Sequence, residues 1–257
     1  MNTYHIKHLD AHLCYHDLPG DTPALVFIHG LGSASSSAFP QVAARPCLRD
    51  RRAILIDLLG YGFSDRPSAF DYTMESQTRI IVELLAELHL SDAIVVGHSM
   101  GGAIAVLVAA AAPDIVTSLV SAEGNLDPVP GSVSGVVTSM PETQFAEHGH
   151  SQFVEQMQAA GLADYASTVR ACDPIAMHRS SVSLIAQRSP TYREQLAALP
   201  IPRMFLFGDR NVPHLDIERL ATDGVDVRII ANAGHDMAGD NPDGLAQAIA
   251  AAARTTH

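Results

Sequence analysis

Short runs of hydrophobic residues alternate along most of the chain with longer stretches of helical periodicity. The short runs are apolar at nearly every position, which is typical of parallel strands covered on both faces. They lie at residues 24–28, 52–57, 93–97, 117–122, 203–207 and 225–230. Segments 4–10 and 12–17 are weaker candidates, and we interpret them as an antiparallel pair at one edge. The pattern predicts an α/β fold with a mostly parallel sheet.

Three longer segments predict helices that pack on this sheet. Residues 74–89 carry Ile80, Ile81, Leu84 and Leu85 at helical spacing, with acidic residues on another face. Residues 100–112 are apolar on all sides, so this helix should lie deep, and it should end before Pro113. Residues 242–254 predict a closing helix.

The alternation stops between Gly124 and Pro200. A Pro-, Gly- and Ser-rich stretch at 127–132 comes first, followed by helical stretches at 151–161, 165–171, 175–187 and 191–199. Because this insertion follows a strand whose carboxyl end should face the site, we interpret residues 125–200 as a helical cap. Residues 1–124 and 201–257 then form the core domain. A helical elaboration that only adds stability is the alternative.

Composition narrows the classes of partner. Of the 257 residues, 47% are hydrophobic and 17% charged, which fits a globular protein with a sizeable core. The formal net charge of −12 argues against nucleic acid and anionic membranes as partners, because phosphate binding needs clustered Lys and Arg. The widely spaced Cys14, Cys47 and Cys172 form no metal or redox motif.

The opening residues contain no apolar stretch of the length that a secretory signal needs, so we expect a cytoplasmic protein. The most apolar run, residues 103–112, is too short to span a bilayer and is better interpreted as a buried helix.

Residues 95–102 read Val-Val-Gly-His-Ser-Met-Gly-Gly, which places Gly-x-Ser-x-Gly between a predicted strand and an apolar helix. A tight turn in this context holds a serine hydroxyl exposed and strained, and glycine at 97 and 101 lets the flanking backbone pass. The helix that follows directs its first N–H groups at developing negative charge. We therefore predict that Ser99 is a nucleophile. A glycine-rich turn with an incidental serine is the alternative.

The loop after the first strong strand contains His29-Gly30-Leu31-Gly32. Acyl transfer needs two backbone donors on the carbonyl oxygen, one from the residue after the nucleophile and one from a neighbouring strand's loop. Met100 and Leu31 are the natural candidates for this oxyanion hole.

A serine hydroxyl is a poor nucleophile at neutral pH and needs a base, usually histidine, within hydrogen-bond reach. The chain contains 13 histidines, so context must select one. Only His235 lies on a loop that follows a sheet strand late enough in the chain to return over Ser99. We predict that His235 is this base.

Together these segments resemble the α/β-hydrolase superfamily. The resemblance rests on the serine turn, the His29–Gly32 loop, Gly234-His235 and the loop Asp57-Leu-Leu-Gly-Tyr-Gly-Phe-Ser-Asp-Arg-Pro, all in the family's order. It covers essentially the whole chain outside the cap. It implies a mostly parallel eight-stranded sheet, a Ser/acid/His triad, and no metal or organic cofactor.

The acid of the triad departs from the commonest family pattern. Asn211 stands where an aspartate would follow the next-to-last strand, and an amide cannot stabilise an imidazolium by charge. Two carboxylates compete for the role. Asp209 lies two residues early, whereas Glu123 ends the preceding strand, a position from which some family members draw the acid. We favour Glu123 and keep Asp209 as the alternative; a structural pairing of Glu123 with Arg179 also stays open.

The resulting hypothesis is hydrolysis of a small-molecule carboxylic ester or lactone through an acyl-enzyme. Serine at 99 argues against dehalogenase and epoxide hydrolase chemistry, which the family performs with a carboxylate nucleophile. A carbon–carbon bond hydrolase with the same triad and a hydrolase-derived receptor with little turnover remain alternatives. Further candidates to contact substrate are Gly30, Gly32, Tyr61, His178 and Arg179. Structural packing is the alternative for Tyr61, and hydrogen bonding between cap and core is the alternative for His178 and Arg179.

Overall fold

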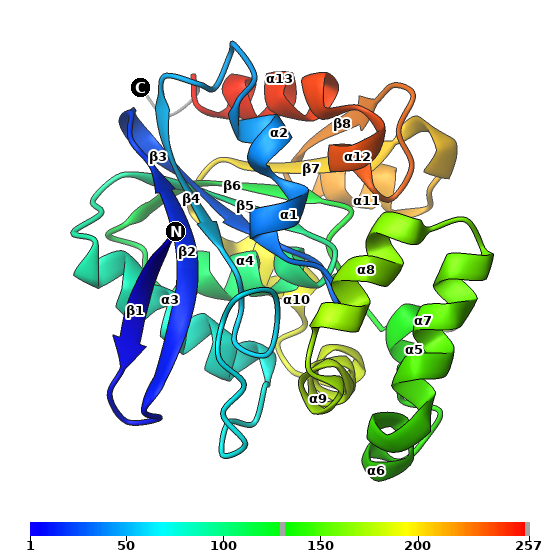
Figure 1. The fold of residues 1–257 in the computed structure, drawn as a ribbon. Coiled ribbons are helices and arrows are strands. Elements are labelled where there is room, and N and C mark those ends of the chain that lie inside the picture. Colours follow the sequence, from blue (N-terminus) through cyan, green and yellow to red (C-terminus); the bar gives the residue numbers. More distant parts are fainter. Residues whose placement is uncertain (129–131, 255–257) are drawn as a thin grey trace.

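A computed structural model of the chain describes residues 1–128 and 132–254. It contains an eight-stranded sheet in the order β1-β2-β4-β3-β5-β6-β7-β8 (Figure 1). The strands are β1 Asn2–Ile6, β2 Ala11–Leu18, β3 Asp21–Ile28, β4 Arg51–Ile56, β5 Ala93–His98, β6 Val116–Ala122, β7 Arg203–Gly208 and β8 Asp226–Ile230. All pairs from β4 to β8 are parallel, and β1 and β2 are antiparallel additions at one edge. The predicted α/β fold class is therefore confirmed.

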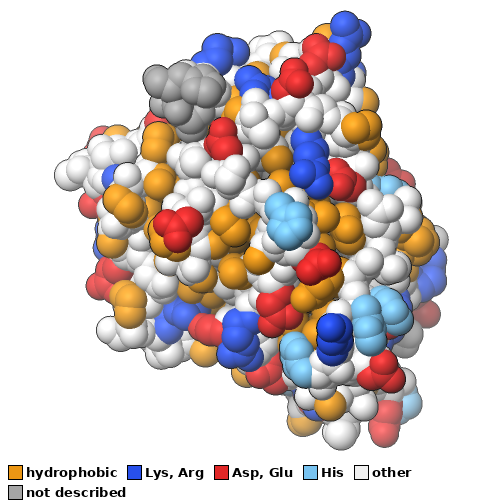
Figure 2. Space-filling view, turned by 90° about the vertical axis from the view of Figure 1, so that its left-hand side faces the viewer, with side chains coloured by type: hydrophobic (Ala, Val, Ile, Leu, Met, Phe, Trp, Pro, Cys, Tyr) orange, Lys and Arg blue, Asp and Glu red, His pale blue; other side chains and the backbone are white. Residues whose placement is uncertain are grey.

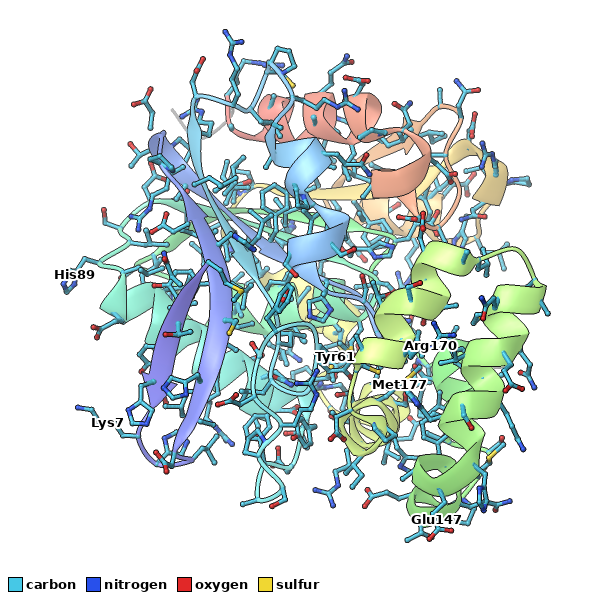
Figure 3. All side chains as sticks on the ribbon, viewed as in Figure 1. Lys7, Tyr61, His89, Glu147, Arg170 and Met177 are labelled. Atoms are coloured by element: carbon cyan, nitrogen blue, oxygen red, sulfur yellow. The ribbon has the colours of Figure 1, made fainter. Side chains whose placement is uncertain are left out.

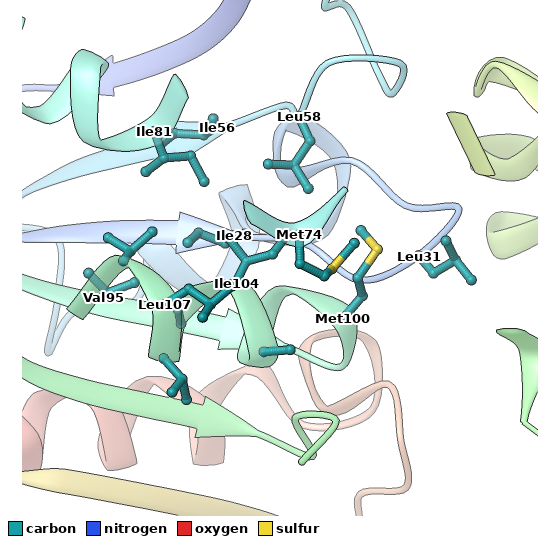
Figure 4. Packing of buried hydrophobic residues seen from close by; sticks show 14 of the residues in the cluster. Ile28, Leu31, Ile56, Leu58, Met74, Ile81, Val95, Met100, Ile104 and Leu107 are labelled. Carbon is teal, nitrogen blue, oxygen red and sulfur yellow. The ribbon is translucent and has the colours of Figure 1, made fainter. Parts of the chain in front are cut away.

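Helices cover both faces of the sheet, because alternate residues of each strand point to opposite sides. Val26 and Ile28 of β3 belong to the hydrophobic cluster beneath α3 (Met74–Glu87) and α4 (Met100–Ala111). Leu25 and Phe27 belong to the cluster beneath α13 (Pro242–Ala252) and α2 (Pro40–Ala43). Figure 4 shows the first cluster, in which Ile104 of α4 lies against Ile28 and Val95. The parallel strands are thus buried on both sides.

The connection from β6 to β7 is helical. It contains α5 Val133–Val137, α6 Glu142–Gln144, a π-helical turn Phe145–Gly149, α7 His150–Ala159, α8 Ala163–Ala171, α9 Pro174–Ile185 and α10 Tyr192–Ala198. The stretches predicted at 151–161, 165–171, 175–187 and 191–199 correspond to α7 to α10. Part of the stretch predicted at 127–132, residues 129–131, lies outside the described residues. Helix α10 contacts α4, so the end of this connection packs on the core.

Short elements elsewhere complete the chain. These are α1 Ser35–Ala38 after β3, a 3₁₀ turn Asp209–Asn211 after β7, α11 Asp216–Thr222, and α12 Met237–Asp240 before α13. The sequence pattern did not predict them, because segments of one or two turns are too short to show a clear periodicity.

Helices α8 and α9 lie against loops that leave the carboxyl ends of β3 and β4. The Tyr165 hydroxyl of α8 donates a hydrogen bond to the Leu31 carbonyl at 3.0 Å. The Asp173 N–H, at the start of α9, donates to the Gly60 carbonyl at 2.8 Å. Figure 3 shows Tyr61 and Met177 where this loop meets α9. These contacts fix the helical connection over the edge of the sheet where the strands end.

On the face shown in Figure 2, acidic, basic and histidine side chains are interspersed with hydrophobic ones. In the described part of the chain, no helix has the length and apolar character required to cross a bilayer.

Candidate active site

Ser99 occupies the turn between β5 and α4 with φ 52° and ψ −120°, a conformation that is strained for a residue with a side chain. Neighbouring glycines permit the turn. A Cβ atom on Gly101 would lie 2.2 Å from the Ile28 carbonyl oxygen, and one on Gly97 would lie 2.2 Å from the Gly101 carbonyl oxygen. The backbone of β3 and the first turn of α4 therefore approach too closely for any larger residue, and Ser99 stands at the amino end of α4.

Glu123 immediately follows β6 with φ 44° and accepts hydrogen bonds from three directions. His235 Nδ1 lies 2.8 Å from Oε2, the Asn211 amide lies 2.7 and 2.8 Å from the two oxygens, and the Gly208 N–H lies 2.9 Å from Oε1. Burial raises the pKa of Glu123, but the hydrogen bonds from His235, Asn211 and Gly208 outweigh it and bring the pKa to about 2. The group is therefore a carboxylate at any physiological pH.

The loop that carries His235 is held by carboxylates on both sides. Asp209 accepts hydrogen bonds from the Asn232 and Ala233 N–H groups at 2.8 and 3.1 Å. Asp240 accepts one from the Gly234 N–H at 2.7 Å. Of the two acids predicted from the sequence, the structure brings Glu123 to the His235 ring and Asp209 to the backbone of its loop.

His98, one residue before Ser99, joins the serine turn to the His235 loop. Its Nε2 lies 2.8 Å from the His235 carbonyl oxygen, and the two imidazole rings are 4.8 Å apart. Since a carbonyl can only accept, His98 donates through Nε2. Burial, followed by the neighbouring His235, lowers the pKa of His98 to about 3, so this donor stays neutral.

The Ser99 hydroxyl donates to the Asn125 side-chain oxygen at 3.3 Å. The Asn125 N–H in turn donates to the Ser99 carbonyl at 3.1 Å. Among the hydrogen bonds of residues 1–128 and 132–254, none joins Ser99 to the His235 ring. A serine hydroxyl turns readily between staggered positions, and catalytic hydrogen bonds often form only when substrate is bound.

The two predicted oxyanion donors are available. Neither the Leu31 N–H nor the Met100 N–H has an acceptor within the described residues, although both side chains are buried. His29 shapes the first of these loops: Nδ1 donates to the Gly30 carbonyl at 2.8 Å, and Nε2 accepts from the Leu58 N–H at 3.1 Å. Figure 4 shows Leu31 on the loop after β3 and Met100 at the start of α4.

The remaining candidates make contacts within the protein. Tyr61 is fully buried and donates to the Ala176 carbonyl at 3.3 Å. His178 Nε2 donates to the Met140 carbonyl at 2.9 Å. Arg179 forms an ion pair with Glu142 at 2.8 Å, so the arginine is not the partner of Glu123.

Gly30 and Gly32 are packed closely as well. A Cβ atom on Gly30 would lie 3.1 Å from His98 Nδ1, and one on Gly32, which has φ 70°, would lie 2.8 Å from the Val169 side chain. Gly30 thus gives the backbone its close approach to the serine turn. Within the described residues, no cluster of three His, Cys, Asp or Glu side chains is arranged to hold a metal ion.

Sequence reasoning missed the contacts of Asn125 and His98 and the part that Asn211 plays. Asn211 did give a signal, because it replaces a carboxylate at a family position. Its amide donates hydrogen bonds to the carboxylate of Glu123. Asn125 and His98 flank Glu123 and Ser99 in the chain, but nothing in the residue pattern indicates where their side chains point.

The sequence profile of the α/β hydrolase fold family matches residues 23–213. The chain therefore belongs to this family. It is 27% identical to the sn-1-specific diacylglycerol lipase ABHD11 of Mus musculus, over 92% of this chain and 83% of the relative. It is 30% identical to haloalkane dehalogenase 2 of Mycobacterium tuberculosis H37Rv, over 90% of this chain and 87% of the relative.

Among solved structures, a thermophilic esterase from Thermogutta terrifontis superimposes with a TM-score of 0.80 at 20% identity. The match covers 96% of this chain and 94% of the esterase. At this identity the likeness shows the fold. Together with the family match, it identifies the chain as an α/β hydrolase.

Replacing Glu123 should separate the two candidate acids. We expect E123Q to lower kcat by about 10² to 10⁴, because glutamine loses the charge and turns an N–H₂ group toward other donors. D209N should lower kcat less than about tenfold, since the amide oxygen keeps one of the two hydrogen bonds to the backbone of the His235 loop. Steady-state kinetics on an ester that wild type hydrolyses, with thermal melts to confirm folding, make the comparison. A larger loss in D209N would assign the acid to Asp209.

Replacing Asn211 with aspartate should make stability depend on pH. A second carboxylate would stand 2.7 to 2.8 Å from the Glu123 oxygens, and repulsion raises the pKa of the pair above the unfolded value. Stability is then highest at low pH and is lost as the pH rises through the raised pKa. Urea denaturation at about pH 5 and about pH 8 should show N211D losing more stability than wild type. N2D, which adds the same charge at an exposed position, is the control; an equal change in all three proteins contradicts the expectation.

Proposed function

We propose that the protein is a serine hydrolase that cleaves a carboxylic ester or lactone through an acyl-enzyme. One observation carries the proposal: a histidine on the last loop of the sheet is hydrogen-bonded at 2.8 Å to an ionised carboxylate, beside a strained serine turn. Nδ1 of His235 faces Glu123, so the lone pair of the neutral ring lies on Nε2. That nitrogen is the base that acts on Ser99.

The steps follow from these positions. Ser99 Oγ attacks the carbonyl carbon and its proton passes to Nε2 of His235, while Glu123 stabilises the imidazolium. The Leu31 and Met100 N–H groups, which have no acceptor in the described part of the chain, bind the oxyanion. His235 protonates the leaving alcohol, then takes a proton from water. The resulting hydroxide attacks the acyl-enzyme, and the proton returns to Ser99.

The name of the lipase relative supports ester chemistry, and the residue at position 99 argues against the reaction named for the dehalogenase relative. Displacement of a halide by serine would leave an alkyl ether on the enzyme. An ether has no carbonyl carbon for water to attack, so the protein could not turn over. Ester hydrolysis leaves an acyl group that water can release.

The helical connection between β6 and β7 acts, in this proposal, as a cap. Helices α8 and α9 are tied to the loops at 31 and 60 by the hydrogen bonds of Tyr165 and Asp173. Those loops leave the same edge of the sheet as Ser99, so side chains of the cap border the acyl-binding space and limit which substrates enter.

A fluorophosphonate probe and short p-nitrophenyl esters test the proposal. We expect covalent labelling at Ser99, found by peptide mass spectrometry, together with ester turnover. S99A should show neither, and H235A should label more slowly by at least about a hundredfold, because the base is lost. A panel of esters, lactones and thioesters then defines the acyl group.

The competing functions give different results. A receptor binds a small molecule but leaves Ser99 unlabelled and the esters intact. Turnover of a 1-haloalkane without ester turnover would support dehalogenase chemistry. Absence of labelling in folded wild-type protein ends the serine hydrolase proposal.

A further inference from the structure

The amide of Asn125 is the side-chain partner of the Ser99 hydroxyl in this structure. Oγ lies 3.3 Å from Oδ1, and the Asn125 N–H donates to the Ser99 carbonyl at 3.1 Å. Within residues 1–128 and 132–254, no other side chain forms a hydrogen bond with Oγ. Asn125 therefore contacts the nucleophile through both its backbone and its side chain.

The segment that carries Asn125 is held firmly against the start of α4. A Cβ atom on Gly102 would lie 2.5 Å from the Gly124 Cα atom, and one on Gly124 would lie 2.2 Å from Ser121 Oγ. The Glu123 N–H donates to the Leu206 carbonyl at 3.0 Å. Packing this close leaves the backbone before Asn125 little freedom, which keeps the Asn125 amide within reach of Ser99.

An amide has an acceptor end and a donor end of nearly the same shape, and the torsion that exchanges them is roughly two-fold. With its oxygen toward Ser99, the amide holds the hydroxyl proton and keeps it from His235. With its N–H₂ group toward Ser99, the amide donates to Oγ, and the hydroxyl proton is free to point at Nε2 of His235. The second arrangement also stabilises the negative charge that develops on Oγ as the proton leaves.

We propose that Asn125 is a further catalytic residue, which accepts from Ser99 in the resting enzyme and donates to Ser99 Oγ during attack and deacylation. The proposal rests on the serine hydrolase function above. The bonds balance: the proton moves from Oγ to His235 and back, and the amide contributes a hydrogen bond without losing a proton. The chemistry requires both ends of an amide.

Aspartate and leucine at position 125 distinguish this role from a structural one. Aspartate has the same shape and keeps only the acceptor, so N125D holds the hydroxyl more tightly and places a charge beside the developing anion. Leucine has a similar volume and neither function. An asparagine with no catalytic role would leave kcat near the wild-type value in N125L, whereas the charge of N125D slows attack in either case.

We therefore expect kcat to fall about tenfold to hundredfold in N125L, and at least about tenfold further in N125D, with little change in KM. The rate of fluorophosphonate labelling should follow the same order. N2D, which adds a charge at an exposed position of β1, should match wild type. Thermal melts confirm that each variant is folded.

Two results overturn the assignment while leaving the proposed function intact. One is N125D with equal or higher kcat than N125L, when wild type is labelled at Ser99. The other is N125A with kcat within about twofold of wild type, a smaller change than the loss of one such hydrogen bond would cause. This second result remains decisive if N125D does not fold. If wild-type Ser99 is not labelled at all, the proposed function and the role of Asn125 both fail.

Discussion

The hydrogen bond between Glu123 and His235 is the interaction on which the candidate site depends. The Glu123 side chain is only 11% exposed, and it keeps its negative charge because Asn211, Gly208 and His235 all donate hydrogen bonds to it. That charge fixes which nitrogen of His235 carries the proton. In the proposed function, the other nitrogen is the base that takes the proton of the Ser99 hydroxyl.

Three carboxylates accept hydrogen bonds from the His235 ring and from the backbone of its loop. Glu123 contacts the ring, whereas Asp209 and Asp240 hold the backbone on either side. His98 adds a neutral donor from the serine turn itself. The loop has no regular secondary structure, so these polar contacts fix its place at the carboxyl edge of the sheet. Parallel strands bring all of these residues together, because β5, β6, β7 and β8 end at that edge.

Periodicity and turn chemistry predicted the sheet, its antiparallel edge and the position of Ser99, because buried parallel strands and a glycine-flanked serine leave strong local patterns. Elements of one turn, such as α1 and α6, carry no such pattern. The sequence does not show which of Glu123 and Asp209 reaches the His235 ring, since two residues of offset after a strand decide where a carboxylate points. The contact of Asn125 with Ser99 depends on side-chain direction, which composition and spacing do not encode. The sequence pattern does not predict the packing of α10 on α4 either.

The position of the proton on His235 shows whether the ring is oriented to act as a base toward Ser99. ¹⁵N NMR of protein labelled at histidine distinguishes the two neutral tautomers, and comparison with H235Q assigns the resonances. We expect neutral His235 to carry its proton on Nδ1 in wild type, and we expect E123Q to disturb this preference. A neutral His235 protonated on Nε2, with its lone pair toward Glu123, would rule out the proposed role of Glu123 in orienting the base.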